Sequence, residues 1–242
     1  MGRDDDIFMA KICEQTERFD DMVSYMKSVV NEGGQDLSIE ERNLLSVAYK
    51  NAIGAHRTAW RALSSIEAKE ESKGSKQLPL LKVYKTKIES ELNKFCKDIL
   101  GLLDSKLIPG AAGSNESQVF YLKMKGDYHR YIAEYSQGDA HQQAQDGALA
   151  AYNSATEVAT AHLKTTHPIR LGLALNSSVF HYEVMNDPTK ACSLAKQAFD
   201  EAIADIEQLD DDVYKDATTI MQLIRDNLTL WTSELEQDQE EG

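Results

Sequence analysis

The chain has 242 residues, 42% of them hydrophobic and only 4 of them proline, so it can bury a substantial core and contains no proline-rich linker. The 40 Asp and Glu residues outnumber the 26 Lys and Arg residues and give a formal net charge of −14. Such a surface repels nucleic acid and anionic lipid, because their binding depends on cations that neutralise phosphate. We therefore expect no nucleic acid and no membrane among the partners.

Catalytic motifs are absent from the sequence, which contains no H-E-x-x-H, G-x-S-x-G, P-loop or G-x-G-x-x-G pattern. The 6 histidines and 3 cysteines lack the spacing of metal ligands. The first residues are polar and acidic, so we expect no signal peptide. These features predict a protein that is not an enzyme, holds no metal or cofactor, and resides in the cytoplasm, with the nucleus as a second compartment.

Helix signals run along nearly the whole chain, whereas alternating strand patterns bounded by turns are absent. Ser38 and Glu41 form a capping box, Asp187 is a favourable N-cap, and Pro168 and Pro188 suit first helical turns. Short links favour antiparallel neighbours. The predicted helices span residues 4–17, 20–32, 38–70, 78–105, 116–136, 140–164, 168–185, 188–204 and 211–234. Residues 235–242 are acidic and lack core residues, so we expect a disordered tail.

Two basic stripes stand out on this acidic chain. Residues 42–66 contain neither Asp nor Glu. They include Lys50, Arg57 and Arg61, which fall within roughly 40° of one another on a helix. On a second helix, Lys123, Asp127, Arg130 and Tyr131 share one face. Arg and Lys suit phosphate oxygens, although cations paired with carboxylates of a neighbouring helix are the simpler alternative.

Two further helices carry an asparagine inside an apolar stripe, where a buried amide needs a hydrogen-bond partner. A neighbouring helix could supply that partner, or the amides could bind the backbone of an extended peptide. Gly172 lies in the first stripe and could mark close approach of another chain, because glycine is unfavourable within a helix. The first stripe comprises Gly172, Leu175, Asn176, Val179 and Glu183, and the second Ile220, Leu223, Asn227, Leu230 and Trp231.

Several long runs, at 42–51, 119–127, 167–176, 191–196, 199–204 and 221–231, resemble the 14-3-3 family. The similarity spans about residues 4–234 and includes the number and order of the helices. The resemblance implies an all-α protomer of nine antiparallel helices in a concave, cup-shaped arrangement. It implies one helical domain over 1–234, in which 1–105 form the dimerisation half and the basic helix and 116–234 the remainder of a ligand groove.

By motif position, the resemblance implies a phosphate site with supporting residues, an amphipathic groove and a dimer interface. The phosphate would be bound by Lys50, Arg57, Arg130 and Tyr131, with Arg61 and Asp127 in support. The groove would comprise Lys123, Gly172, Leu175, Asn176, Val179, Glu183, Ile220, Leu223, Asn227, Leu230 and Trp231. The dimer interface would include Ile12, Arg18, Asp21, Tyr84, Lys87 and Glu91, with Arg18 facing Glu91 and Asp21 facing Lys87.

The resemblance also implies the function: an adaptor that binds phosphoserine- or phosphothreonine-containing segments of client proteins and regulates their activity, localisation or interactions. It would act as a homodimer or as a heterodimer with a paralogue. Thr219, Ser177 and His129 depart from the residues usual in the family and bear on which clients are preferred. The alternatives are a helical-repeat scaffold indifferent to phosphorylation, whose 34-residue period we do not find, and a structural dimer with internally neutralised cations.

Overall fold

The computed structural model describes residues 2–33, 36–206 and 211–241. These residues contain no strand, which confirms the all-α prediction. The long helices are α1 (Arg3–Gln15), α2 (Phe19–Glu32), α3 (Ile39–Ser72), α4 (Leu78–Leu102), α6 (Asn115–Tyr135), α7 (Gly138–His162), α8 (Pro168–Glu183), α9 (Pro188–Asp205) and α10 (Asp211–Glu241). Among them, none has the length and apolar character that crossing a membrane requires.

Local capping chemistry explains where several helices begin. The Ser38 Oγ accepts from the Glu41 backbone N at 3.2 Å, and the Ser38 backbone N donates to Glu41 Oε2 at 2.8 Å, which confirms the predicted capping box. The Asp187 carboxylate accepts from the Lys190 backbone N at 2.9 Å at the start of α9. Both side chains satisfy N–H groups that have no partner within the first helical turn.

The end of α4 differs from the single helix predicted over 78–105. Regular α-helical bonding stops at Leu102, a π-helical turn η1 spans Leu103–Leu107, and a short α5 follows at Ile108–Gly110. Pro109 explains the change, because its ring lacks an N–H and would clash with the carbonyl four residues earlier in a regular α-helix. The wider turn relieves that clash.

The last helix is longer than predicted. The α10 helix continues to Glu241, so the expectation of a disordered tail over 235–242 is wrong for 235–241, and Gly242 lies outside the described residues. The run from 234 to 241 is rich in Glu and Gln and contains neither Gly nor Pro. Glu and Gln have favourable helix propensities, so a segment without core residues can continue a helix that packing has already formed.

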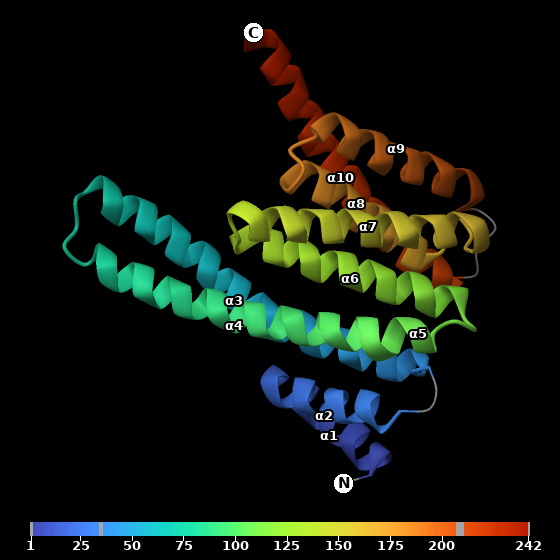
Figure 1. Ribbon diagram of the computed structural model, residues 1–242. Helices are drawn as coiled ribbons and strands as arrows, with labels where there is room; N and C mark the ends of the chain where they lie inside the picture. Colours follow the sequence, from blue (N-terminus) through green and yellow to red (C-terminus); the bar gives the residue numbers. More distant parts are fainter. Residues whose placement is uncertain (1, 34–35, 207–210, 242) are drawn as a thin grey trace. The chain divides into compact units, whose positions relative to one another are not determined.

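The chain divides into two compact units, Met1–Gly110 and Ala111–Gly242. The boundary lies in the interval 106–115, which the predicted division of the chain left between its two parts. In the first unit α1 packs on α2, α2 on α3, and α3 on α4, and Figure 1 shows α3 and α4 as an antiparallel pair. The prediction of one domain over 1–234 stays a prediction.

A polar network lies at the border of the apolar core of the first unit, with Tyr49 buried and Lys27 and Asp98 partly exposed. The Tyr49 hydroxyl donates to Asp98 Oδ2 at 2.6 Å, and Lys27 Nζ lies 2.5 Å from Asp98 Oδ1. Burial and the nearby carboxylate both raise the pKa of Tyr49, so the phenol keeps its proton and serves as a donor. The network ties α2, α3 and α4 together.

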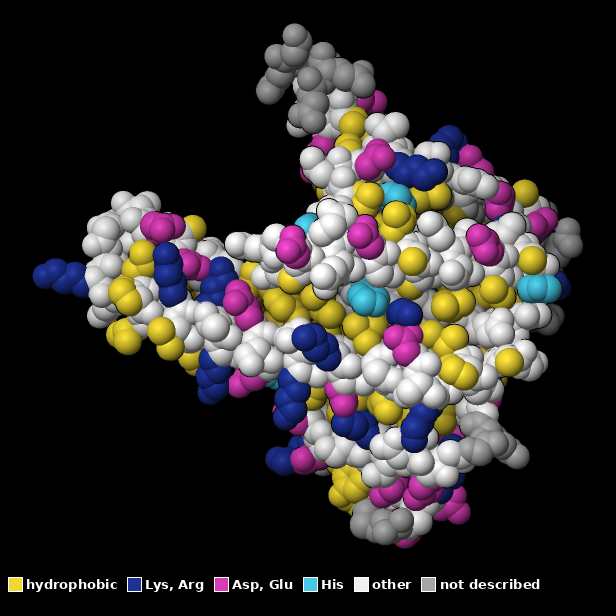
Figure 2. Space-filling view, viewed as in Figure 1, with side chains coloured by type: hydrophobic (Ala, Val, Ile, Leu, Met, Phe, Trp, Pro, Cys, Tyr) yellow, Lys and Arg dark blue, Asp and Glu magenta, His cyan; other side chains and the backbone are white. Residues whose placement is uncertain are grey.

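In the second unit α6 and α7 pack along their length, and α8, α9 and α10 pack against one another (Figure 1). Small residues make the first of these contacts possible, because the buried face of α7 carries Ala148, Ala155 and Ala159. On the face seen in Figure 2, acidic and basic side chains are interspersed with hydrophobic ones. Net charge alone therefore does not locate a site on this protein.

Replacing Ser38 with Ala should lower the free energy of unfolding by about 1 kcal/mol, because the N-terminal turn of α3 loses its side-chain acceptor. Urea unfolding followed by circular dichroism would measure the change. Ser72→Ala is the matched control, since Ser72 lies at the other end of α3 and its hydroxyl only donates to the Lys69 carbonyl. An equal loss in both variants would contradict the assigned role of the cap.

Candidate functional site

A buried carboxylate on α6, that of Asp127, contacts two cations of the same helix. Lys123 Nζ lies 2.9 Å from Asp127 Oδ2, and Arg130 Nη2 lies 3.4 Å from Asp127 Oδ1. The spacings of four and three residues place all three side chains on one side of the helix. Asp127 is 7% exposed and Arg130 8%, so these charges interact largely out of water. The structure thus brings together the three charged residues predicted on this helix.

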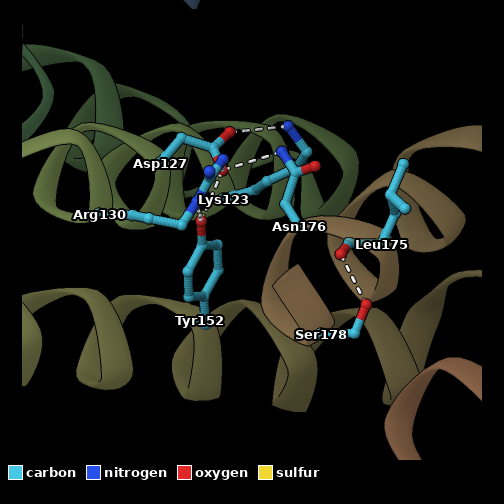
Figure 3. Close-up of polar contacts among 7 residues, drawn as sticks. All are labelled: Lys123, Asp127, Arg130, Tyr152, Leu175, Asn176 and Ser178. Atoms are coloured by element: carbon cyan, nitrogen blue, oxygen red, sulfur yellow. Dashed lines mark hydrogen bonds and ion pairs between the residues drawn. The ribbon is translucent and has the colours of Figure 1, made fainter. Parts of the chain in front are cut away.

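Two residues from other helices complete the network, which Figure 3 shows. The Tyr152 hydroxyl of α7 donates to Asp127 Oδ1 at 2.6 Å and accepts from Arg130 Nε at 3.1 Å. The Asn176 Nδ2 of α8 donates to the same Oδ1 at 2.9 Å. An ionised carboxylate only accepts hydrogen bonds, so it must face the amide NH₂ of Asn176. We refer to Lys123, Asp127, Arg130, Tyr152 and Asn176 as the Asp127 network.

The electrostatics keep this network charged. Burial by itself would raise the pKa of Asp127, but the neighbouring Lys123 and Arg130 outweigh it and the pKa is lowered. Burial likewise opposes the charge on Arg130, yet Tyr152 and Asp127 raise its pKa. Because the Asp127 pKa lies below its ordinary value of 3.8, the carboxylate stabilises the folded chain above that pH and loses this effect as the pH falls through the lowered pKa.

Sequence reasoning missed Tyr152 and the glycine that admits it. A Cβ at Gly126 would lie 2.6 to 2.9 Å from three atoms of the Tyr152 ring, closer than any side chain tolerates. Glycine at this position therefore lets the ring reach the carboxylate. The available signals were a glycine inside the basic helix and one large side chain within an alanine-rich stretch of α7. Neither signal shows that these two residues, on different helices, lie against each other.

Within the second unit, the surroundings of Gly172 leave room for a side chain. A Cβ there would meet only the Cε of Lys123, at 3.5 Å, which is ordinary van der Waals contact. No close contact within the described part of the chain requires a glycine here, and the hypothesis that Gly172 marks close approach of another chain stays a prediction. The contact does place the stem of Lys123 beside Gly172, one turn before Asn176 on α8. Two predicted groove residues, Lys123 and Gly172, are thus neighbours in the second unit.

The predicted apolar stripes lie on α8 and α10, which pack against each other. Leu175, Val179 and Ile220 are partly buried against a shared core cluster, while Leu223 is 49% exposed and Leu230 is 55% exposed. Exposed leucines beside half-buried ones provide an apolar surface that remains open to a ligand. Two further stripe residues, Glu183 and Asn227, are exposed and partly buried respectively.

The side chain of Trp231 packs mostly inside the second unit. It is only 3% exposed, and its ring stacks on that of Tyr182 with centroids 4.7 Å apart and an interplanar angle of 12°. Burial of a large indole stabilises the core more than a place on an open wall would. Trp231 therefore supports the α8 and α10 pair from within, and its place alongside a ligand stays a prediction.

The other predicted phosphate residues belong to both units. Tyr131 on α6 is partly buried, and the Arg130 guanidinium carbon lies 4.9 Å from its ring centroid. Lys50, Arg57 and Arg61 lie on α3 in the first unit, with Lys50 and Arg61 exposed and Arg57 partly buried. The structure therefore assembles the second-unit half of the predicted site, and the joining of the two halves stays a prediction.

The predicted dimer residues lie in the first unit and are largely accessible, with Tyr84 52% exposed and Ile12 36% exposed. Their charges pair within the chain: Arg18 Nε lies 2.5 Å from Asp21 Oδ2, and Lys87 Nζ lies 3.9 Å from Glu91 Oε1. In the predicted dimer, Arg18 would exchange Asp21 for Glu91 of the partner chain, and Lys87 would exchange Glu91 for Asp21 of the partner chain. Each cation would thus keep a carboxylate partner.

Replacing Asp127 with Ala should lower the free energy of unfolding by about 3 kcal/mol, because two cations lose a buried counter-ion. Denaturant unfolding would measure the loss. Asp146→Ala is the control: that carboxylate lies on the exposed side of α7 and accepts from Gln142, so its removal should change stability by less than about 0.5 kcal/mol. A loss at Asp127 no larger than at Asp146 would contradict the central role of this carboxylate.

Comparison with known proteins places the chain. A family model described as 14-3-3 protein matches residues 9–232. The chain is 59% identical to Protein BMH2 of Saccharomyces cerevisiae, over 99% of this chain and 88% of that protein. It is 58% identical to 14-3-3-like protein C of Nicotiana tabacum and 57% identical to 14-3-3 protein 6 of Solanum lycopersicum, in each case over 98% of this chain and 92% of the relative. The chain therefore belongs to the 14-3-3 family.

Proposed function

We propose that this protein is an adaptor that binds phosphoserine- or phosphothreonine-containing segments of client proteins and itself catalyses no reaction. The observation that carries the proposal is the Asp127 network, in which Lys123 and Arg130 are held against one carboxylate. Two cations and one anion leave a net positive charge in a nearly buried position. A buried excess of positive charge is costly unless an anion joins it, and a phosphate group is such an anion.

The proposed site adds Lys50, Arg57 and Arg61 of α3 to this network. An unmodified serine brings no charge, whereas a phosphoserine brings about −1.5 to −2 and three acceptor oxygens. A hydrogen bond to a charged group contributes about 1.5–3 kcal/mol, so several of them separate strong binding from none. Selectivity for the phosphorylated form follows from this difference in charge.

The ligand backbone would be held by asparagine side chains. Because the NH₂ of Asn176 faces Asp127, its amide oxygen is the group available to a ligand and would accept a backbone N–H. Asn227 on α10 would provide the second amide. The flanking surface of Leu223 and Leu230 would bind apolar side chains of the client, since both leucines are about half exposed.

The alternative is a scaffold that binds its partners whether or not they are phosphorylated. On that alternative, the Asp127 network only stabilises the fold and binds no ligand. The first experiment is a calorimetric titration of matched peptides, with and without phosphate on a single serine. Binding of only the phosphorylated peptide supports the adaptor, and equal binding of both supports the scaffold. Binding of neither would leave the structural dimer as the better account.

Lys50→Glu should weaken phosphopeptide binding at least about a hundredfold, because it removes one cation and adds a charge that repels phosphate. Arg57→Ala should act in the same direction. Both should keep the helical content of the wild type. Lys69→Glu is the control, since it reverses a charge near the C-terminus of the same helix, away from the stripe. Calorimetric affinities equal to that of the wild type for Lys50→Glu and Arg57→Ala would exclude α3 from the site.

We also propose that the protein forms dimers, as homodimers or with a paralogue, through its first unit. Apolar side chains are accessible there: Phe8 is 61% exposed and Tyr84 52%, while Leu80 and Val83 each exceed 70%. Figure 2 shows hydrophobic side chains at the free end of the α3 and α4 pair. Surfaces of this kind commonly mark contacts between proteins. Two proposed grooves would then act on one doubly phosphorylated client, which raises its effective concentration at the second groove.

The double variant Arg18→Ala, Asp21→Ala should shift the protein toward monomers, because both proposed ion pairs across the interface lose a partner. Light scattering would report the mass. The matched control removes Lys196 and Asp200, an exposed ion pair of 2.6 Å on α9, and should leave the mass unchanged. A double variant whose mass equals that of the wild type would refute the proposed interface.

A further inference from the structure

A tyrosine hydroxyl on α7 occupies one edge of the Arg130 guanidinium. The Tyr152 Oη accepts from Arg130 Nε at 3.1 Å, while Arg130 Nη2 approaches Asp127 Oδ1 at 3.4 Å. Nε and Nη2 form the side edge of the planar group, so Tyr152 and Asp127 hold that edge together (Figure 3). The end of the group, formed by Nη1 and the second hydrogen of Nη2, points away from this edge. Two parallel donors at that end match the oxygens of a phosphate.

Tyr152 can make this contact only because of its surroundings. The side chain is 1% exposed and its ring packs against Phe180 with centroids 5.5 Å apart. On its other side the ring lies in the recess left by Gly126, where any Cβ would overlap it. Its hydroxyl also donates to Asp127, and burial followed by that carboxylate raises its pKa, so the phenol remains protonated. The donor and acceptor directions of the hydroxyl are therefore both fixed.

We propose that Tyr152 is a positioning residue for the proposed phosphate site, and that Gly126 is the position that admits it. Tyr152 touches no ligand itself. It fixes the plane of Arg130 in the unbound protein, so that the terminal N–H groups are already directed at an incoming phosphate. This inference rests on the proposed function, and it adds a residue on α7 to a site otherwise assigned to α3, α6, α8 and α10.

The physical effect is pre-organisation. A long arginine side chain that is free to rotate loses conformational entropy when a ligand fixes it, and this loss weakens binding. Asp127 alone would attract the guanidinium without fixing its plane, because a single contact of 3.4 Å allows rotation. The Tyr152 hydroxyl supplies the second contact that determines the plane.

The test is Tyr152→Phe, which keeps the ring in the Gly126 recess and removes only the hydroxyl. We expect its dissociation constant for a singly phosphorylated peptide to rise about tenfold, and exchange of the Arg130 Nε–H with water, measured by NMR, to become faster. Tyr121→Phe is the matched control, because Tyr121 is a fully buried phenol on α6 whose ring contacts Phe120. It should change neither the affinity nor the exchange.

Two outcomes would overturn the inference: a Tyr152→Phe protein that binds the phosphopeptide as tightly as the wild type, or an Arg130 Nε–H in the unbound wild type that exchanges as fast as in a free arginine. The second measurement needs no variant, so it decides the matter if Tyr152→Phe does not fold. Failure of the proposed function is recognised separately, since the wild type would then bind the phosphorylated and unphosphorylated peptides equally.

Discussion

The hydrogen bonds to the Asp127 carboxylate link three helices of the second unit. One oxygen accepts from Lys123, and the other accepts from Tyr152, Asn176 and, at longer distance, Arg130. A carboxylate taken out of water must replace its hydration with such contacts, or it would be protonated instead. The negative charge of Asp127 also offsets the repulsion between the Lys123 and Arg130 cations. The charge and the geometry of the proposed site therefore both depend on this one group.

Close packing of α6 and α7 makes that burial possible. Gly126 accepts the ring of Tyr152, and Gly147 on α7 accepts the ring of His129, since a Cβ there would lie 2.7 Å from the imidazole. Alanines along the buried face of α7 keep the two helices near each other. Small residues thus place large polar side chains between the helices. The proposed pocket is in this sense a consequence of helix packing rather than of loop structure.

Local signals account for what the sequence predicted. The cap at Ser38 and the prolines at the starts of α8 and α9 are read from neighbouring residues, and the helices begin within a few residues of the predicted positions. The shared face of Lys123, Asp127 and Arg130 follows from helical spacing alone. The resemblance to a known family supplied the link between these residues and phosphate, and the comparisons confirm the family.

Contacts between helices were not predictable in the same way. The bond from Tyr152 to Asp127 joins residues 25 positions apart and depends on how two helices are rotated against each other. Burial of Trp231 and the ordinary surroundings of Gly172 depend on packing in the same manner. The π-helical turn before Pro109 and the helical end of α10 show a different cause, in which backbone sterics and propensity outweigh a simple reading of composition.

The most direct measurement is the phosphorus NMR titration of a phosphopeptide bound to the protein. The dianion of a free phosphoserine takes up a proton at about pH 6. Surrounding cations stabilise the dianion, so the account predicts that the pKa of the bound phosphate is lowered and that its resonance does not change between about pH 7 and pH 5.5. Asp127 remains ionised in this range because its pKa is lowered. A bound phosphate that titrates at the same pH as the free peptide would contradict the proposal that guanidinium and ammonium groups surround it.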